Sequence, residues 1–308
     1  MSLRQLDSDP LAPVVETGAP LPPVIEVATG GGGFRRRSAR RENVGLGICL
    51  AWIGLVVVCA IGARWFPGVK GPNAIDPFNR LKGPTASHLF GTDELGRDIF
   101  ARVLYGARVS AVVAVVSLAV GLCVGGAIGL VAGYFRGWIE GVIVWATDVL
   151  LSFPALVMLI ALVAYTGRSL MHISLALGFL AVPVYTRLSR AHALNIAGEE
   201  FVLAARAGGA RRLRVLRREV LPNVLPSLLA YGLIAMSLTI VVEGTLSFLG
   251  LSVSAPTPSW GGLIADGQHY LKEAPMMVIL PSLVLCLTVL ALNIAGETLR
   301  RRYESGGG

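Results

Sequence analysis

Residues 199–223 read EEFVLAARAGGARRLRVLRREVLPN and form the longest strongly polar stretch between the first and last apolar blocks of the chain. Glu199 and Glu200 precede an alanine-rich segment, where carboxylates favour the start of a helix because they complement its dipole. Gly208 and Gly209 follow, and glycine commonly ends a helix because it tolerates the left-handed conformation. The first half of the stretch therefore predicts a short, slim helix that ends at the glycine pair.

A second helix is expected in the rest of the stretch, ending at Pro222. At helical spacing its side chains form an apolar face and a basic face, made of Leu213, Leu216 and Val220 and of Arg211, Arg214 and Arg218. Two interpretations remain open from these residues alone. Either the two-helix hairpin docks into a groove on a partner protein, or it is a positively charged loop held beside lipid head groups.

Composition indicates an integral membrane protein. Hydrophobic residues make up 54% of the 308 residues and charged residues only 15%, and the mean hydropathy is +0.67, which is outside the range of ordinary soluble domains. Several apolar runs reach the roughly 20 residues that cross about 30 Å of hydrocarbon, and they do not alternate as the strands of a membrane barrel do. The expected fold is therefore all-α, a polytopic membrane protein.

Six transmembrane helices are expected, at residues 46–63, 109–133, 142–165, 173–188, 224–246 and 276–296. With the first helix entering from the cytoplasm, both termini and residues 199–223 lie inside. This topology places 18 arginines and lysines on the inner side and 9 on the outer side, in agreement with the positive-inside rule. Small residues in the second helix would let another helix approach closely; they are Gly121, Gly125, Gly126 and Gly129.

Four parts are expected along the chain. Residues 1–43 form a disordered, basic cytoplasmic tail, and residues 44–108 contain the first transmembrane helix and an outer segment. Residues 109–299 form a five-helix core that includes the 199–223 stretch, and residues 300–308 form a cytoplasmic tail. The basic run before the first helix lies too far from the N-terminus to be part of a signal peptide.

Several classes of function find no support in the sequence. Membrane topology accounts for the net charge of +8, so this charge does not indicate nucleic acid. The four cysteines lie in apolar runs and the four histidines are scattered, so neither a disulfide framework nor a metal site is expected. We find no convincing internal repeat, as in a secondary transporter, and no constellation of catalytic groups, as in a membrane enzyme.

Two acidic residues lie inside expected spans, where a charge is costly and normally faces a cavity or a partner. Asp148 either pairs with a cationic group at the inner interface or lies in a translocation path. Glu243 either makes a polar contact with the turn that follows its helix or lies in the same path. In the path, either carboxylate could meet the amino terminus of a peptide.

The outer segments carry charged and aromatic residues with two possible uses each. Asp93, Arg97 and Asp98 either form internal ion pairs and helix caps or serve as ligands. The first use is expected, because opposite charges spaced so closely commonly pair. Trp260 is expected to anchor the chain at the membrane interface or, alternatively, to contact an extracytoplasmic partner.

The 199–223 stretch resembles the EAA loop of the membrane subunits of bacterial ABC importers. The pattern of that loop is EAA, three residues, G, nine residues, I, any residue, LP. The matching positions are Ala204, Ala205, Gly209, Leu221 and Pro222. Leu203 stands in place of the first glutamate and Glu219 in place of the isoleucine.

Two further segments resemble the dipeptide and oligopeptide permeases of the C type. HLFGTDELGRDIFARVLYGARVS, residues 88–110, carries the first signature at Gly91, Thr92, Asp93, Gly96, Arg97 and Asp98. EGTLSFLGLSVSAPTPSWGGLI, residues 243–264, carries the second signature at Ser247, Phe248, Leu249, Gly250, Pro258, Trp260 and Gly261. Ser252 replaces a glycine that usually closes the first half of the second signature.

The resemblance implies the type I ABC importer permease fold and a non-catalytic subunit that moves di- or oligopeptides; a permease for nickel or another small solute is the alternative. It also implies a second homologous permease subunit, two cytoplasmic ATPase subunits and an extracytoplasmic peptide-binding protein. The chain has no GxxxxGK[ST] motif, so ATP and magnesium would be held by the partners and no cofactor by this chain. The expected location is the bacterial inner membrane.

In this family the EAA loop couples the permease to the ATPases, and its first short helix is the coupling helix. On this chain that helix would span about residues 200–209. The residues that the resemblance assigns to coupling are Glu199, Glu200, Ala204, Ala205, Arg206, Gly208, Gly209, Leu221 and Pro222.

Overall fold

The computed structural model describes residues 32–65 and 71–305. The chain divides into two units, residues 1–41 and 42–308. The expected disorder of residues 1–31 lies outside the described part. Helix α1, Gly32–Gly62, already includes residues 32–43, so the expectation of disorder up to residue 43 is wrong there; the arginines and alanines of this segment are good helix formers.

The described residues form an all-helical membrane protein. Five helical runs are long and apolar enough to cross a bilayer: Asn43–Gly62, Ile99–Phe135, Leu170–Ile196, Arg212–Phe248 and Met276–Tyr303. The elements that build the last four are α2 (Ile99–Val120), a π-helical turn (Gly121–Gly125), α3 (Gly126–Phe135), α6 (Leu170–Ile196), α8 (Arg212–Val215), a second π-helical turn (Leu216–Val220), α9 (Leu221–Phe248) and α11 (Met276–Ser305).

The remaining expected span is not one continuous helix, which corrects the expectation for residues 142–165. It consists of α4 (Trp138–Ser152) and α5 (Ala155–Thr166), and the two axes are bent by 84°. Pro154 explains the break, because proline cannot donate to the preceding turn and disfavours a helical conformation of the residue before it. Phe153 is accordingly extended, with φ −80° and ψ 137°.

Helix α6 packs closely on the α2–α3 run along a stripe of glycines. A Cβ atom built at Gly125 would lie 2.9 Å from Tyr185 Cβ, and one at Gly129 would lie 2.9 Å from Ser189 Cβ. Gly121 makes the same kind of contact, which confirms the predicted close approach at three of the four glycines. Gly126 is the exception, because a Cβ there would meet its nearest neighbours at an ordinary 3.8 Å.

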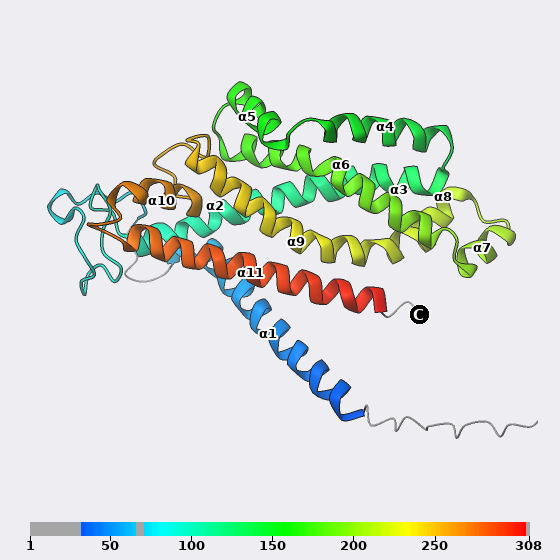
Figure 1. Ribbon diagram of the computed structural model, residues 1–308, viewed down its shortest axis with the longest axis horizontal. Coiled ribbons are helices and arrows are strands. Elements are labelled where there is room, and N and C mark those ends of the chain that lie inside the picture. The colour runs from blue at the N-terminus through cyan, green and yellow to red at the C-terminus, as the bar shows by residue number, and fades with distance from the viewer. Residues whose placement is uncertain (1–31, 66–70, 306–308) are drawn as a thin grey trace, which may run out of the picture. The chain divides into compact units, whose positions relative to one another are not determined.

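Two ends of the helical bundle carry the candidate functional regions (Figure 1). Helix α9 packs against α11, and α6 packs against α2 and α3. Helix α7 (Glu200–Ala207) lies at one end of these helices, and α10 (Trp260–Gly267) lies at the other. We call them the α7 end and the α10 end.

We predict that Gly125→Ala destabilises the protein whereas the neighbouring Gly126→Ala does not. The added methyl at residue 125 overpacks the α6 contact, which typically costs about 1–3 kcal/mol, while both changes favour the helix equally. Thermal unfolding in detergent should show a midpoint several degrees lower for Gly125→Ala alone. Equal midpoints for the two variants would show that the glycine stripe does not limit the approach of α6.

Candidate functional site

The predicted short helix of the 199–223 stretch is confirmed as α7. Glu199 is the residue before its first turn, and Glu200 lies in that turn. Gly209 adopts a left-handed conformation with φ +79°, and its N–H donates to the Arg206 carbonyl at 3.0 Å. The N–H of Ala210 donates to the Ala205 carbonyl at 3.2 Å, so the glycine pair ends the helix as the sequence predicts.

One face of α7 is fixed to the bundle. The Val202 side chain is fully buried, with 0% exposed, in a hydrophobic cluster that includes residues of α3, α6 and α9. The guanidinium carbon of Arg206 lies 4.7 Å from the centroid of the Tyr134 ring, a cation–π contact with the end of α3. These contacts fix α7 to residues of three of the long helices.

The other face of α7 is open and partly apolar. Phe201 is 43% exposed and Leu203 is 49% exposed, at the end of a polar segment where bulky apolar side chains are costly to expose. Ala204, Ala207 and Gly208 are exposed beside them. This surface, which we call the α7 tip, combines two large apolar side chains with a slim backbone, a shape that fits a groove on another protein.

The second helix of the stretch does not end at Pro222, contrary to the prediction. Its helical run continues from Arg212 through Pro222 to Phe248. A π-helical turn, Leu216–Val220, precedes Pro222, which lies within the first two positions of α9, where a missing N–H is tolerated.

The predicted apolar face of this run is also partly wrong. Leu216 and Val220 are buried as expected, but Val215 takes the third buried position, because the wider π turn shifts the helical register. Leu213 is exposed instead. Arg211, Arg214 and Arg218 are exposed, and so are Leu221 and Pro222.

At the α10 end, Asp93 organises a buried ionic network. Its Oδ2 atom accepts from Arg97 Nε at 2.6 Å and from Arg102 Nη1 at 3.1 Å. Its Oδ1 atom accepts from the backbone N–H groups of Leu95 and Arg97 at 2.9 Å each. The predicted internal ion pair of Asp93 and Arg97 is thus confirmed. Asp93 also pairs with Arg102, and Glu94 gives Arg97 a second carboxylate at 2.8 Å.

Asp98 is the helix cap that the sequence predicts. Its Oδ1 atom accepts from the Ala101 N–H at 2.8 Å at the start of α2. Its Oδ2 atom lies 2.8 Å from His88 Nδ1. Asp98 therefore joins the start of a transmembrane run to the segment that precedes it.

The other members of the first signature shape a turn. Gly96 has φ +76°, and a Cβ there would collide with the Asp76 carbonyl. Gly91 also has a positive φ of +84°. The buried Thr92 donates its hydroxyl to the Asn79 carbonyl. These positions hold the segment in shape.

Glu243 contacts the turn that follows its helix. The carboxylate is fully buried, with 0% exposed, and its Oε1 atom accepts from Ser252 Oγ at 2.6 Å and from Ser247 Oγ at 3.2 Å. The polar-contact alternative is therefore the one that the structure shows. Ser252, the residue that departs from the second signature, donates the shorter of these bonds.

Trp260 is neither an interfacial anchor nor an exposed contact residue, which corrects both expectations. Only 1% of it is exposed, and its indole Nε1–H donates to the Val103 carbonyl at 3.0 Å. A buried tryptophan needs such a partner for its N–H. Gly261, next to it, brings α10 against α9, because a Cβ there would lie 2.9 Å from Ser247 Oγ.

The rest of the second signature is divided between surface and interior. Phe248 and Leu249 are about half-exposed at the end of α9, and Gly250 turns the chain with φ +68°. Pro258 is buried.

Asp148 forms an ion pair with Arg187 of α6, and both side chains are about half-exposed. Of the two alternatives expected for Asp148, the structure therefore shows the pair with a cationic group. The partner comes from another helix 39 residues along the chain, so sequence spacing could not identify it.

Four further residues contribute to these regions without having been predicted. Val202 and Tyr134 anchor α7, and helical spacing of Val202 with Ala205 is a signal that could have identified the buried face. Arg102 and Asp266 meet at the α10 end, at 4.0 Å between Nη2 and Oδ2. No local pattern pairs them, because 163 residues separate them in the chain.

The family described as "Binding-protein-dependent transport system inner membrane component" matches residues 125–306. The probable peptide ABC transporter permease protein y4tQ of Sinorhizobium fredii is 41% identical over 245 residues, 80% of this chain and 83% of the relative. The dipeptide transport system permease protein DppC of Alkalihalophilus pseudofirmus is 36% identical over 82% of this chain and 84% of its own.

Two more matches extend the comparison. The glutathione transport system permease protein GsiD of Shigella flexneri is 37% identical over 86% of this chain and 87% of its own. A solved structure of the MetNI methionine ABC transporter in inward-facing conformations contains a chain with the same fold, at a TM-score of 0.51 and 17% identity. That match covers 66% of this chain and 96% of the solved chain.

We predict that Asp93→Ala strongly destabilises the protein. The change leaves Arg97 and Arg102 buried without their shared carboxylate, and breaking such a buried pair costs about 3–5 kcal/mol. Thermal unfolding in detergent should show a much lower midpoint, whereas Glu273→Ala, at an exposed residue, should leave it unchanged. Similar midpoints for the two variants would contradict a structural role for Asp93.

Proposed function

Because this chain belongs to the family of binding-protein-dependent transport system inner membrane components, we propose that it imports peptides and is driven through α7 by partner ATPases. The chain is an ABC importer permease with the fold of that family. The α7 tip carries the proposal, because two large exposed apolar side chains lie on a helix whose opposite face is locked to the bundle.

The proposed partners of the α7 tip are two cytoplasmic ATPase subunits that hold ATP and magnesium. One ATPase subunit would receive the α7 of this chain, and the other would receive the equivalent helix of a second, homologous permease subunit. Phe201 and Leu203 would fill the docking groove, while Val202 and Arg206 transmit its movement to the bundle. A rigid coupling element of this kind suits two-state opening and closing of a path.

The proposed substrate is a di- or oligopeptide, delivered by an extracytoplasmic binding protein. Three relatives support this substrate class, because their names specify a peptide, a dipeptide and glutathione, which is itself a tripeptide. These relatives each align with at least 80% of the present chain, so the likeness is not confined to the region that contains α7.

We further propose that the α7 end faces the bacterial cytoplasm and that both termini lie there. Arg302 hydrogen-bonds Asn43 at the start of the first span, so the last span returns to the side from which the first one departs. The α7 end also carries the exposed arginines of the α8 region, as the positive-inside rule requires of a cytoplasmic side.

We predict that Phe201→Asp abolishes the stimulation of ATP hydrolysis in the assembled transporter. A charge placed in an apolar docking groove without a partner weakens binding by about 2 kcal/mol or more. The assembled transporter should lose at least tenfold of the ATPase activity that the peptide-loaded binding protein stimulates, while the variant chain inserts in the membrane normally.

Leu213→Asp is the matched control, because Leu213 is similarly exposed on the neighbouring α8 but lies outside the α7 tip. This variant should retain stimulated ATPase activity. Full stimulation of the Phe201→Asp transporter would contradict docking at the α7 tip, and uptake of nickel instead of peptides would contradict the proposed substrate.

A further inference from the structure

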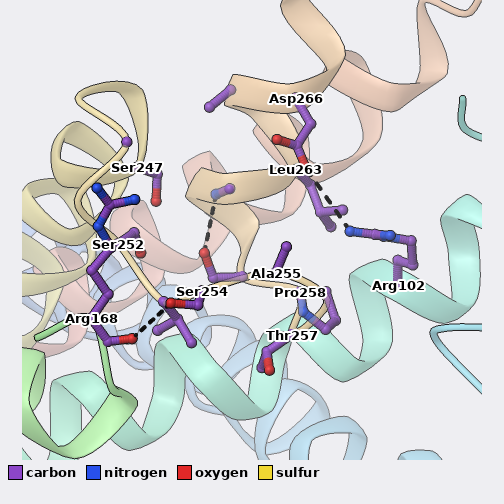
Figure 2. A pocket seen from close by; sticks show the side chains of 15 residues that line it. Arg102, Arg168, Ser247, Ser252, Ser254, Ala255, Thr257, Pro258, Leu263 and Asp266 are labelled. Carbon is purple, nitrogen blue, oxygen red and sulfur yellow. Dashed lines mark hydrogen bonds and ion pairs between the residues drawn. The ribbon is translucent and has the colours of Figure 1, made fainter.

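A cavity of about 180 Å³ lies at the α10 end (Figure 2). Its walls come from the loop before α6, the start of α2, the loop after α9 and helix α10. The charged residues that line it are Arg102, Arg168 and Asp266. A single water needs only about 10–15 Å³ of such a cavity, so there is room for a small molecule of several heavy atoms.

Arg102 and Asp266 form one side of the cavity. The Arg102 side chain is buried and already donates to Asp93 through Nη1, which balances its charge within the protein. Its Nη2 atom lies 4.0 Å from Asp266 Oδ2, which is beyond hydrogen-bond length. The Asp266 side chain is 55% exposed, so its carboxylate can still accept hydrogen bonds from a ligand.

Arg168 lies on the opposite side of the cavity from Asp266 (Figure 2). Its backbone carbonyl accepts from Ser254, at 3.4 Å from the N–H and 3.3 Å from the hydroxyl, so the loop that carries it is fixed to the loop after α9. Within the described part of the chain, its guanidinium group has no hydrogen-bond or ion-pair partner. An arginine in this situation can donate two parallel hydrogen bonds to a planar carboxylate.

Three of the five hydroxyl-bearing residues that line the cavity already donate their hydroxyl groups within the protein, and the other two are Thr257 and Ser259. Ser247 and Ser252 donate to Glu243, and Ser254 donates to Arg168. Charge therefore decides what the cavity selects. Arg168 is positively charged on one side of the cavity, and Asp266 is negatively charged on the other. Asp266 would repel a ligand that is only negatively charged, whereas a ligand that carries both charges can pair with both residues.

We propose that this cavity binds a small zwitterionic peptide, with its carboxylate on Arg168 and its ammonium group on Asp266. Arg102 lies beside Asp266 at the cavity edge, with 4.0 Å between Nη2 and Oδ2. The inference rests on the proposed function, because it assigns a subsite to the peptide that this permease imports. It places that subsite at the α10 end, where the peptide would arrive from the delivering protein.

The test uses the purified full chain in lipid nanodiscs, without the delivering protein, and dialanine as the probe. Isothermal titration should show saturable binding to the wild type. Arg168→Gln and Asp266→Asn should each weaken it at least tenfold, whereas Lys272→Gln and Glu273→Gln, at exposed charges outside the cavity, should not change it. Circular dichroism checks that every variant keeps its helices.

Blocked peptides assign each charge to its partner. Dialanine amide lacks the carboxylate and should bind the wild type more weakly than dialanine does. Because this ligand cannot pair with Arg168, Arg168→Gln should not weaken its binding further. N-acetyl-dialanine lacks the ammonium group and should also bind the wild type more weakly than dialanine does. Because this ligand cannot pair with Asp266, Asp266→Asn should not weaken its binding further. Absence of saturable dialanine binding, or binding to both variants within twofold of the wild type, would overturn the proposal.

Peptide uptake by cells separates this inference from the proposed function. If uptake requires the chain but neither substitution weakens dialanine binding, the proposed subsite is wrong and the proposed function stands. If uptake does not require the chain, the proposed function is wrong. Dialanine binding that both substitutions weaken would still establish the cavity as a zwitterion site.

Discussion

The close approach of α6 to the α2–α3 run is the contact on which the rest of the fold depends. In hydrocarbon, helices gain little from the hydrophobic effect, so close packing and internal hydrogen bonds must hold them together. The glycines of the stripe bring the backbones near, and α6 then donates side-chain hydrogen bonds to carbonyls that lie opposite. Ser189 Oγ donates to the Gly126 carbonyl at 2.7 Å, and Thr186 Oγ1 donates to the Gly125 carbonyl at 3.2 Å. The position of α6 sets both ends of the molecule, because α7 follows its last turn and Arg168 precedes its first.

Several buried polar groups elsewhere in the bundle also find hydrogen-bond partners, although Oε2 of Glu243 has none among the described residues. The Glu243 carboxylate takes hydroxyl donors from the turn that follows its own helix, and Trp260 uses a backbone carbonyl of α2. At the α10 end, one aspartate serves two arginines and two backbone N–H groups. Charge that would be costly if left unpaired thus becomes the means of fixing loops to helices.

The sequence predicted the features that depend on neighbouring residues. The apolar spans, the glycine contacts of the second span, the two ends of α7 and the cap at Asp98 all follow from local spacing and composition. What the sequence left undetermined or misjudged depends on tertiary contacts. Trp260 is buried because α2 covers it, the partner of Asp148 comes from another helix, and the pairing of Arg102 with Asp266 joins distant segments. Pro154 and Pro222 were both misjudged: Pro154 breaks an apolar run that looks continuous, while Pro222 lies in the first turn of a helix instead of ending one.

The two longest helical runs have a mechanical consequence. Ile99–Phe135 and Arg212–Phe248 each contain 37 residues, which at 1.5 Å per residue gives about 55 Å, against roughly 30 Å of hydrocarbon. Each run therefore extends well beyond the bilayer without an intervening loop. The overhang of Arg212–Phe248 starts beside α7, where it contributes to the cluster that holds Val202. A tilt of such a rod about a pivot in the membrane would move its end in proportion to the overhang, so each continuous helical run has the geometry of a lever.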